Sequence, residues 1–381
     1  MDGKLLHKLI DFRKDLHKYP EVSGEEKETA KRLVDFIEQF HPDEIIGNIG
    51  TYGLAFVFNG KTKGPVTMFR SELDALPIQE INTFDHKSVY DGKAHKCGHD
   101  GHMAMIAGMA ALLHKNPPEK GKVILLYQPE EETGTGALKV LDDKKFRELK
   151  PDYLFSLHNL PGIPLGEIRC RSDIFASASV GLIVRLTGKT SHAAEPENGN
   201  SPAMAMASIV QEIETLTTKV SLSDFGLITT IHVKLGERAF GTTPGYAEVM
   251  ATIRTYRNTD LDKLKNAAID KIKTITKPYG LKTDFEWVEE FSDTHNNKDA
   301  VEVIKKAADE NNLPFLWMKE PYRWSEDFGY FLKEYKGAMF GLGAGEKQPQ
   351  LHNPDYDFPD DLIPVGTGMF YSIVKQYNYD R

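Results

Sequence analysis

The hydrophobic residues of this chain fall into short runs, separated by longer stretches with helical spacing. Runs rich in β-branched and aromatic residues predict strands at 54–58, 66–69, 123–127, 153–157 and 338–342. Apolar positions that recur every three or four residues predict helices at 6–16, 25–40, 103–113 and 137–149. Strands that alternate with helices indicate an α/β sheet with helices on both of its faces.

The stretch from 177 to 285 has a pattern of its own. It predicts a strand, a helix, two strands, a helix and a strand, at 180–186, 202–216, 227–235, 246–254, 261–275 and 281–288. This order is typical of a ferredoxin-like α+β domain. Because the later residues return to the α/β pattern, we expect an α/β domain built from 1–176 and 286–381, with the smaller domain inserted at 177–285.

The composition is that of a folded protein with two domains. The chain has 381 residues, 40% of them apolar and 27% charged, whereas a single core rarely exceeds about 250–300 residues. The net charge of −9 disfavours nucleic acids and anionic membranes as partners. The two cysteines, Cys97 and Cys170, form no disulfide framework. No apolar run approaches the ~20 residues that span a bilayer, and the N-terminus lacks a secretory-signal pattern, so we expect a cytoplasmic protein.

Side chains that can bind metals or protons follow several of the predicted strands. In chain order they are Asp74, the pair Glu131 and Glu132, His158 and, after a glycine-rich turn, His352. Ligands of open α/β sheets bind beyond the carboxyl ends of the strands, so we expect these side chains to converge. Cys97 and His99 stand just before the predicted helix at 103–113 and can reach the same edge.

This set of donors predicts a metal centre, because divalent transition metals bind thiolate, imidazole and carboxylate groups. Five such ligands, one of them bridging, suit two ions about 3.5–4 Å apart, an arrangement that activates water and polarises a carbonyl. Neighbouring side chains of an extended segment point in different directions. One of the adjacent glutamates can therefore bind metal while the other serves as a general base.

Six motifs, in order over nearly the whole chain, resemble those of a known family. They are Cys97-Gly98-His99-Asp100-Gly101-His102, Gln128-Pro129-Glu130-Glu131-Glu132, His158-Asn159-Leu160-Pro161-Gly162, Ser191-His192-Ala193-Ala194, Ser325-Glu326-Asp327-Phe328 and Leu351-His352-Asn353-Pro354. The chain resembles the aminoacylase/carboxypeptidase family of dinuclear metallopeptidases, and within it the amidohydrolase branch of N-acyl-amino-acid amidohydrolases, hippurate hydrolases and auxin-conjugate hydrolases. The resemblance implies a zinc-peptidase-like catalytic domain with a mixed sheet, which carries an inserted ferredoxin-like lid.

The resemblance implies a role for each residue of the metal centre. Cys97 would be the ligand shared by the two ions, and Glu131 would be the general base. Asp74 would orient a metal-binding imidazole. The ligands that complete the two sites would be His99, Glu132, His158 and His352.

The resemblance also implies two functional residues in the lid. His192 would help to hold the scissile carbonyl oxygen, often across a dimer interface, and Arg254 would pair with the substrate carboxylate. A homodimer through the lid domain is therefore an expected assembly. The sequence departs from the family pattern at Gly241, where the family has asparagine, and at Glu130 and Lys96, where it usually has alanine.

The expected reaction is hydrolysis of the amide bond of an N-acyl amino acid by a metal-bound water, with Glu131 as base. Thiolate and imidazole ligands favour zinc for the two divalent ions, while manganese, cobalt and nickel stay open. A dipeptidase, a carboxypeptidase or a deacetylase of an N-acetylated diamino acid would use the same residues. The non-enzyme alternative, a metal- or peptide-binding protein that has lost catalysis, predicts damage at the base or the ligands, and these are all intact.

Overall fold

The computed structural model describes residues 1–380 and separates them into two compact units. Unit 1 contains Met1–Phe175, Thr294–Glu320 and the described residues from Asp327 onward, and unit 2 contains Ala176–Asp293 and Pro321–Glu326. Unit 2 extends beyond residue 285, where the sequence pattern placed its end, because its last strand continues to Phe291. Its second, short segment was not predicted, since nothing in the local pattern of those six residues indicates it.

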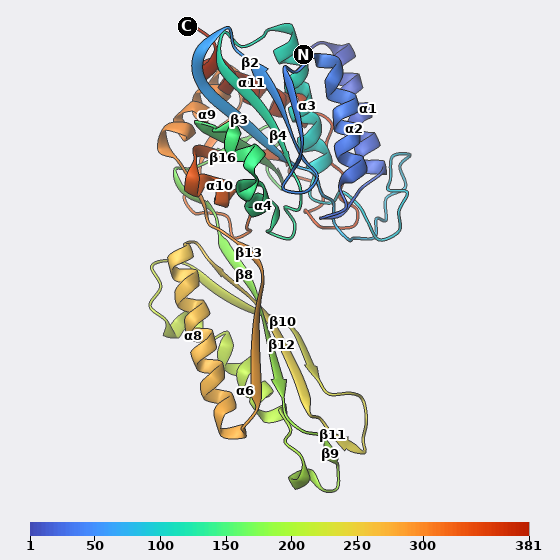
Figure 1. Ribbon diagram of the computed structural model, residues 1–381, viewed down its shortest axis with the longest axis vertical. Helices are drawn as coiled ribbons and strands as arrows, with labels where there is room; N and C mark the ends of the chain where they lie inside the picture. Colours follow the sequence, from blue (N-terminus) through green and yellow to red (C-terminus); the bar gives the residue numbers. More distant parts are fainter. Residues whose placement is uncertain (381) are drawn as a thin grey trace. The chain divides into compact units, whose positions relative to one another are not determined.

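Within residues 1–380, the centre of unit 1 is an eight-stranded sheet (Figure 1). In spatial order its strands are β1 (Glu44–Ile49), β2 (Gly53–Asn59), β4 (Lys120–Gln128), β3 (Thr62–Glu72), β5 (Tyr153–Pro161), β16 (Lys336–Gly345), β6 (Ile168–Cys170) and β15 (Phe315–Trp317). β4, β3, β5 and β16 are parallel to one another, whereas β1 with β2, β2 with β4, and β16 with β6 form antiparallel pairs. The predicted mixed sheet is confirmed.

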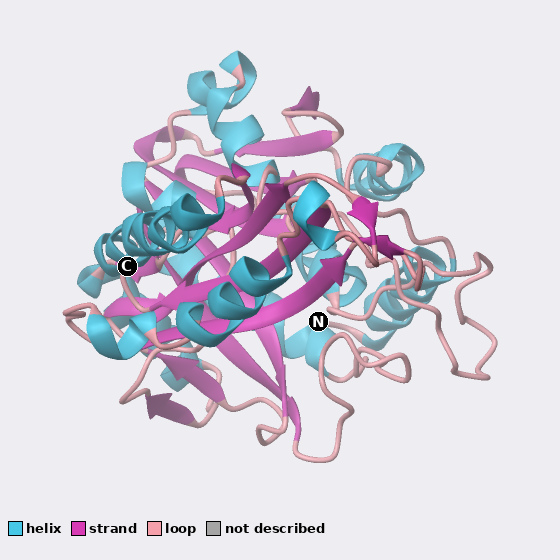
Figure 2. Cartoon of the chain, turned by 90° about the horizontal axis from the view of Figure 1, so that it is seen from below, coloured by secondary structure: helices cyan, strands magenta, loops and turns pink. Residues whose placement is uncertain are grey.

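Helices cover both faces of this sheet. Those of one face are α1 (Gly3–Lys18), α2 (Lys27–Ile37), α3 (His99–Lys115), α9 (Lys298–Glu310) and α11 (Leu362–Asn378). Along β2, Phe56 and Phe58 join the core beneath these helices, while the buried side chains of Ala55 and Val57 face the other way. The short helices α4 (Gly136–Asp142), α5 (Lys144–Leu149) and α10 (Gly329–Glu334) lie on that other side. Figure 2 shows the helices, strands and loops of the chain in different colours.

The single helix predicted at 137–149 is wrong, because the chain forms α4 and α5 there. Asp143 between them has an extended backbone, and its side chain accepts a hydrogen bond from the amide of Lys145 at 2.8 Å. This contact caps α5 and ends α4. A short 3-10 helix, η1 (Glu38–Phe40), follows α2.

Unit 2 is a four-stranded antiparallel sheet with two helices side by side against it (Figure 1). Its main elements are β8 (Ala178–Thr187), α6 (Ala203–Ile213), β10 (Gly226–Leu235), β12 (Tyr246–Thr255), α8 (Asn258–Thr276) and β13 (Lys282–Phe291). The spatial order β10-β12-β8-β13 is the ferredoxin-like arrangement that the sequence pattern predicts. The smaller elements are β9 (Ser191–His192) paired with β11 (Thr242–Thr243), η2 (Pro196–Asn198), α7 (Leu216–Lys219) and η3 (Lys277–Tyr279).

The parallel strands of unit 1 position the candidate site. Because β4, β3, β5 and β16 run in one direction, their carboxyl ends share an edge, where Glu72 ends β3 and Gln128 ends β4. β7 (Asp173–Ala176) and β14 (Thr294–Asn296) form a separate two-stranded sheet. Among residues 1–380, every helix is too short or too polar to traverse a lipid bilayer.

Candidate active site

The loop before α3 brings a thiol and an imidazole to the edge of the sheet. Cys97 and His99 flank Gly98, which adopts a left-handed backbone with φ of 92°. A Cβ atom added at Gly98 would lie 2.7 Å from the side-chain amide of Asn159. Only glycine therefore allows this close approach and this backbone, and the helix starts immediately afterwards.

Cys97, His99 and His158 form a buried group whose potential ligand atoms all lie within 4.8 Å of one another. The Sγ atom of Cys97 is 3.4 Å from Nε2 of His158. Nδ1 of His158 is 2.9 Å from the backbone carbonyl oxygen of Asn159, so the ring donates its Nδ1 proton there and turns the Nε2 lone pair toward the thiol. Burial, and then the neighbouring His102, lower the pKa of His158 to about 3. The imidazole is therefore neutral, which is the form that binds metals.

A second group shares the same thiol. It consists of Cys97, Glu132 and the half-exposed His352, with Nε2 of His352 3.7 Å from a carboxylate oxygen of Glu132. Nε2 of His99 lies 3.8 Å from the nearest carboxylate oxygens of both Glu131 and Glu132. This nitrogen is buried and makes no hydrogen bond within residues 1–380. A buried ring nitrogen with no hydrogen bond, close to two carboxylates and a thiol, marks a place that a cation fits, so these residues suit the metal ions expected from the sequence.

Asp74 orients the imidazole of His99. Its backbone oxygen accepts a hydrogen bond from Nδ1 of His99 at 2.8 Å, and its Oδ1 lies 3.5 Å from the same nitrogen. Oδ2 accepts hydrogen bonds from the Ser23 hydroxyl at 2.7 Å and from the Glu132 amide at 2.9 Å. Burial opposes ionisation, but the contact with His99 outweighs it and lowers the pKa of Asp74. Asp74 therefore stays ionised and directs Nε2 of His99 into the site.

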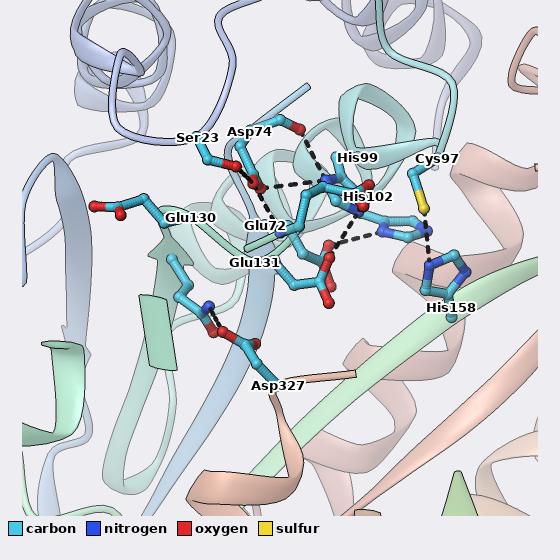
Figure 3. A network of polar contacts seen from close by, with 12 residues as sticks. Ser23, Glu72, Asp74, Cys97, His99, His102, Glu130, Glu131, His158 and Asp327 are labelled. Atoms are coloured by element: carbon cyan, nitrogen blue, oxygen red, sulfur yellow. Dashed lines mark hydrogen bonds and ion pairs between the residues drawn. The ribbon is translucent and has the colours of Figure 1, made fainter. Parts of the chain in front are cut away.

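The three consecutive glutamates do not point the same way, and Figure 3 shows the side chains of Glu130 and Glu131 turned apart. Glu130 has a positive φ of 55°, its amide donates to Glu26 at 2.8 Å, and its side chain turns away from His99 to accept a hydrogen bond from Thr51 at 3.0 Å and to pair with Lys139. Glu131 instead faces the imidazole of His99, as Figure 3 shows, and the carboxylate of Glu132 lies 3.8 Å from Nε2 of the same ring. The backbone turn at Glu130 thus sets which two glutamates enter the site.

A chain of buried polar contacts supports the site, and its members Arg70 and Glu72 had no role predicted from the sequence. Nδ1 of His102 lies 2.8 Å from Glu72, and its Nε2 lies 2.7 Å from the side-chain oxygen of Asn159. Arg70 contacts Glu72 on one side and Asp327 at 2.7 Å on the other. The only sequence signal for these residues was their place within or beside the motifs, because the contacts join strands and loops far apart in the chain.

Unit 2 carries the two remaining predicted residues. His192 is exposed on β9, and its Nδ1 accepts a hydrogen bond from the amide of Ala194 at 3.1 Å. Arg254 is half-buried on β12, and its Nη1 donates to the Ser325 hydroxyl at 3.0 Å and to the carbonyl oxygen of Arg323 at 3.3 Å. Within the described residues it forms no ion pair with a carboxylate, and burial lowers its pKa.

Comparison with known proteins decides the family. The model of peptidase family M20/M25/M40 matches residues 68–376. The chain belongs to this family. The M20 assignment confirms the predicted resemblance and the predicted enzyme class, a metal-dependent hydrolase that acts on amide bonds.

Relatives of this M20 chain are similar over nearly their whole length. An N-acetyldiaminopimelate deacetylase of Bacillus subtilis is 28% identical, with 96% of this chain and 98% of the relative aligned. An IAA-amino acid hydrolase of Arabidopsis thaliana is 29% identical over 97% of this chain and 85% of its own. The crystal structure of a dinuclear metal-binding M20 peptidase from Bacillus subtilis superposes with a TM-score of 0.82, at 25% identity and 98% coverage of both chains.

Proposed function

We propose that this M20 enzyme removes the acyl group from an N-acyl amino acid. The observation that carries the proposal is the pair of candidate ligand groups that share Cys97, with Glu131 beside them. The names of three relatives support this substrate class, because each describes an acyl group on an amino acid. They are N-acetyldiaminopimelate deacetylase, N-acetyl-L-cysteine deacetylase and IAA-amino acid hydrolase. A small molecule of this kind is the proposed partner.

Two divalent transition-metal ions are the proposed cofactors. Cys97 would be shared between them, and the remaining ligands would be His99, Glu132, His158 and His352. Bound there, the ions would make water more acidic and polarise the scissile carbonyl. The thiolate and imidazole donors favour zinc, and manganese, cobalt and nickel are the other candidates.

Glu131 is the proposed general base. Its carboxylate is almost completely buried and lies 3.8 Å from Nε2 of His99, at the rim of both ligand groups. From this position it would take the proton of the attacking water and return it to the leaving amine. Glu130 is unsuited to the same task because its carboxylate is engaged by Thr51 and Lys139.

His192 and Arg254 are proposed to bind the substrate. Nδ1 of His192 accepts a backbone hydrogen bond, which leaves the proton on Nε2, and this exposed N–H suits a developing carbonyl oxyanion. Ser325 and the carbonyl of Arg323 fix one nitrogen of Arg254, so that the remaining donors suit a carboxylate.

We further propose that two copies of the enzyme pair through unit 2. β10 is an edge strand, since it pairs with β12 alone in its sheet. Four apolar side chains on it are exposed, namely those of Leu227, Ile231, Val233 and Leu235. An open edge with apolar side chains favours pairing with another strand, here the same edge of a second copy.

A panel of substrates tests the proposed function. Metal-stripped protein would be assayed with N-acetyl-diaminopimelate, N-acetyl-cysteine, indole-acetyl amino acids and simple dipeptides, after addition of each candidate metal. We expect no turnover without metal and the fastest turnover with an N-acyl amino acid. Within the N-acyl amino acids, an N-acetylated diamino acid is a specific candidate substrate, because several relatives are named N-acetyldiaminopimelate deacetylase. Full activity in metal-free protein would contradict the mechanism, and a preference for dipeptides would contradict the substrate class.

A further inference from the structure

Lys96 is a completely buried lysine directly before Cys97. Its ammonium group donates to three acceptors from two different loops: Glu80 at 2.6 Å, the side-chain oxygen of Asn82 at 2.9 Å, and the backbone oxygen of Tyr356 at 2.7 Å. A buried charge is costly unless it is paired and hydrogen-bonded, and here all three protons of the ammonium have an acceptor. None of its donors is left for a substrate, so its role lies in the contacts it already makes.

The backbone of Lys96 makes a fourth connection. Its carbonyl oxygen accepts a hydrogen bond from the amide of His352 at 2.8 Å. His352 itself has a positive φ of 65°, a conformation that a non-glycine residue adopts only when its surroundings hold it there. Lys96 therefore grips the His352 loop at two points, the amide of His352 and the carbonyl oxygen of Tyr356.

The contacts of Lys96 support the Cys97–Glu132–His352 group more directly than the Cys97–His99–His158 group. Cys97 follows Lys96 in the chain, and His352 is bonded to its carbonyl, so two of the three members of the Cys97–Glu132–His352 group depend on this residue. His99 and His158 have supports of their own in Asp74 and the carbonyl of Asn159. Loss of the lysine should therefore lower the metal affinity of the Cys97–Glu132–His352 group more than that of the Cys97–His99–His158 group.

We propose that Lys96 is a positioning residue that fastens the Cys97 loop to the His352 loop and so sets the geometry of the Cys97–Glu132–His352 group. The proposal rests on the proposed function, in which this group holds one of two ions. Glu80 and Asn82, which surround the ammonium, fix the Lys96 side chain in the place from which it reaches the Tyr356 carbonyl.

Metal titration of the stripped protein against a competing chelator, with Zn²⁺ and with Co²⁺, tests the proposal. The main variant is Lys96→Met combined with Glu80→Gln, because removing both charges leaves no unpaired ion buried. We expect wild-type protein to bind two ions, and the double variant to bind one normally and the other at least about 10-fold more weakly, the usual scale for groups that orient ligands. The cobalt–thiolate charge-transfer absorption should change as well.

Two further variants complete the design. Ile304→Ala, in the buried face of α9, lowers the melting temperature without touching either loop and should keep both ions. Lys96→Arg keeps the charge, but a planar guanidinium cannot point at three acceptors placed around one ammonium, so the same ion should be weakened to a smaller degree. If the double variant does not fold, metal titration of Lys96→Arg tests the proposal in its place.

Native affinity for both ions in the folded double variant, or in Lys96→Arg, would overturn the proposal and leave Lys96 a role in the fold alone. Failure of the wild-type protein to bind two ions would instead overturn the proposed function. The two failures are therefore distinguishable in one titration series.

Discussion

At the scale of single residues, the proposed mechanism depends on which glutamate faces the candidate metal ligands. Glu131→Gln should keep its metal and lose activity by about 10²–10⁴-fold, because an amide cannot accept the proton of the attacking water. Glu132→Gln should lose metal as well, since its carboxylate lies 3.7 Å from His352 within a candidate ligand group. Metal content and turnover of both variants would be measured side by side.

Glu130→Gln is the control for this pair. Its side chain contacts Thr51 and Lys139 rather than the ligands, so the substitution should lower stability slightly and leave turnover nearly unchanged. If Glu130→Gln abolished activity while Glu131→Gln did not, the assignment of the three consecutive glutamates would be off by one residue.

At the scale of elements, the turn that starts α3 is the most demanding local structure. Gly98→Ala should lower the melting temperature and weaken metal binding, because the new Cβ would meet Asn159 at 2.7 Å and φ is 92°. We expect a cost of more than about 1 kcal/mol in the free energy of unfolding. Thermal unfolding and metal titration would measure the two effects.

Asn297, which caps a helix outside the candidate site, provides a control for Gly98→Ala. The side chain of Asn297 accepts hydrogen bonds from the amides of Asp299 and Ala300, each at 3.1 Å, at the start of α9. Asn297→Ala should cost about 1 kcal/mol of stability with no change in metal affinity. Equal losses of metal in the two variants would show that Gly98 acts only through global stability.

At the scale of the whole molecule, stability should depend on pH through His17. This buried imidazole lies 2.9 Å from Asp100 and 3.1 Å from Glu80. Burial opposes its protonation, but these hydrogen bonds outweigh burial and raise the pKa of His17 to about 9. Because the pKa of His17 is about 6.5 in the unfolded chain, its protonation stabilises the fold fully below that pH. This contribution to the free energy of unfolding, up to about 3 kcal/mol, disappears as the pH rises through 9.

Denaturant unfolding between pH 6 and pH 10 checks this dependence. The free energy of unfolding should fall with rising pH in the wild-type protein, and the slope should be flatter in His17→Gln, which has no such proton to lose. An unchanged slope in the variant would assign the pH dependence to other groups.

The assembly is tested by mixing two inactive variants. His192→Ala should lower kcat and kcat/KM together without changing metal content, as expected for a contact made mainly in the transition state. If the unit 2 of one copy serves the metals of another, a mixture of His192→Ala and Glu131→Gln chains should regain activity. A mixture that exchanges subunits but stays inactive would show that each chain uses its own His192.

The local pattern predicted the main elements well because their apolar periodicity is strong. The core strands of both units and the long helices α1, α3 and α8 lie where the sequence pattern placed them. The pattern gave no separate prediction for α9 and α11, which lie in a stretch expected only to have α/β character, and it missed the division of one predicted helix by the side chain of Asp143 into α4 and α5. The end of β13 at Phe291 was missed for a similar reason, since pairing with β8 extends it beyond its apolar run.

The sequence by itself determined the chemistry of the candidate site, because carboxylate and imidazole residues follow parallel strands whose ends must meet, and a thiol and a further imidazole stand at the start of the neighbouring helix α3. Only the tertiary structure decided how these groups are held. Glu130 turns away because its amide meets Glu26, and Arg70 meets Asp327 across a separation of 257 residues. Lys96 is fastened to Tyr356 across 260 residues. Contacts between such distant residues leave no periodic signal in the chain, since they depend on loops that only the folded sheet brings together.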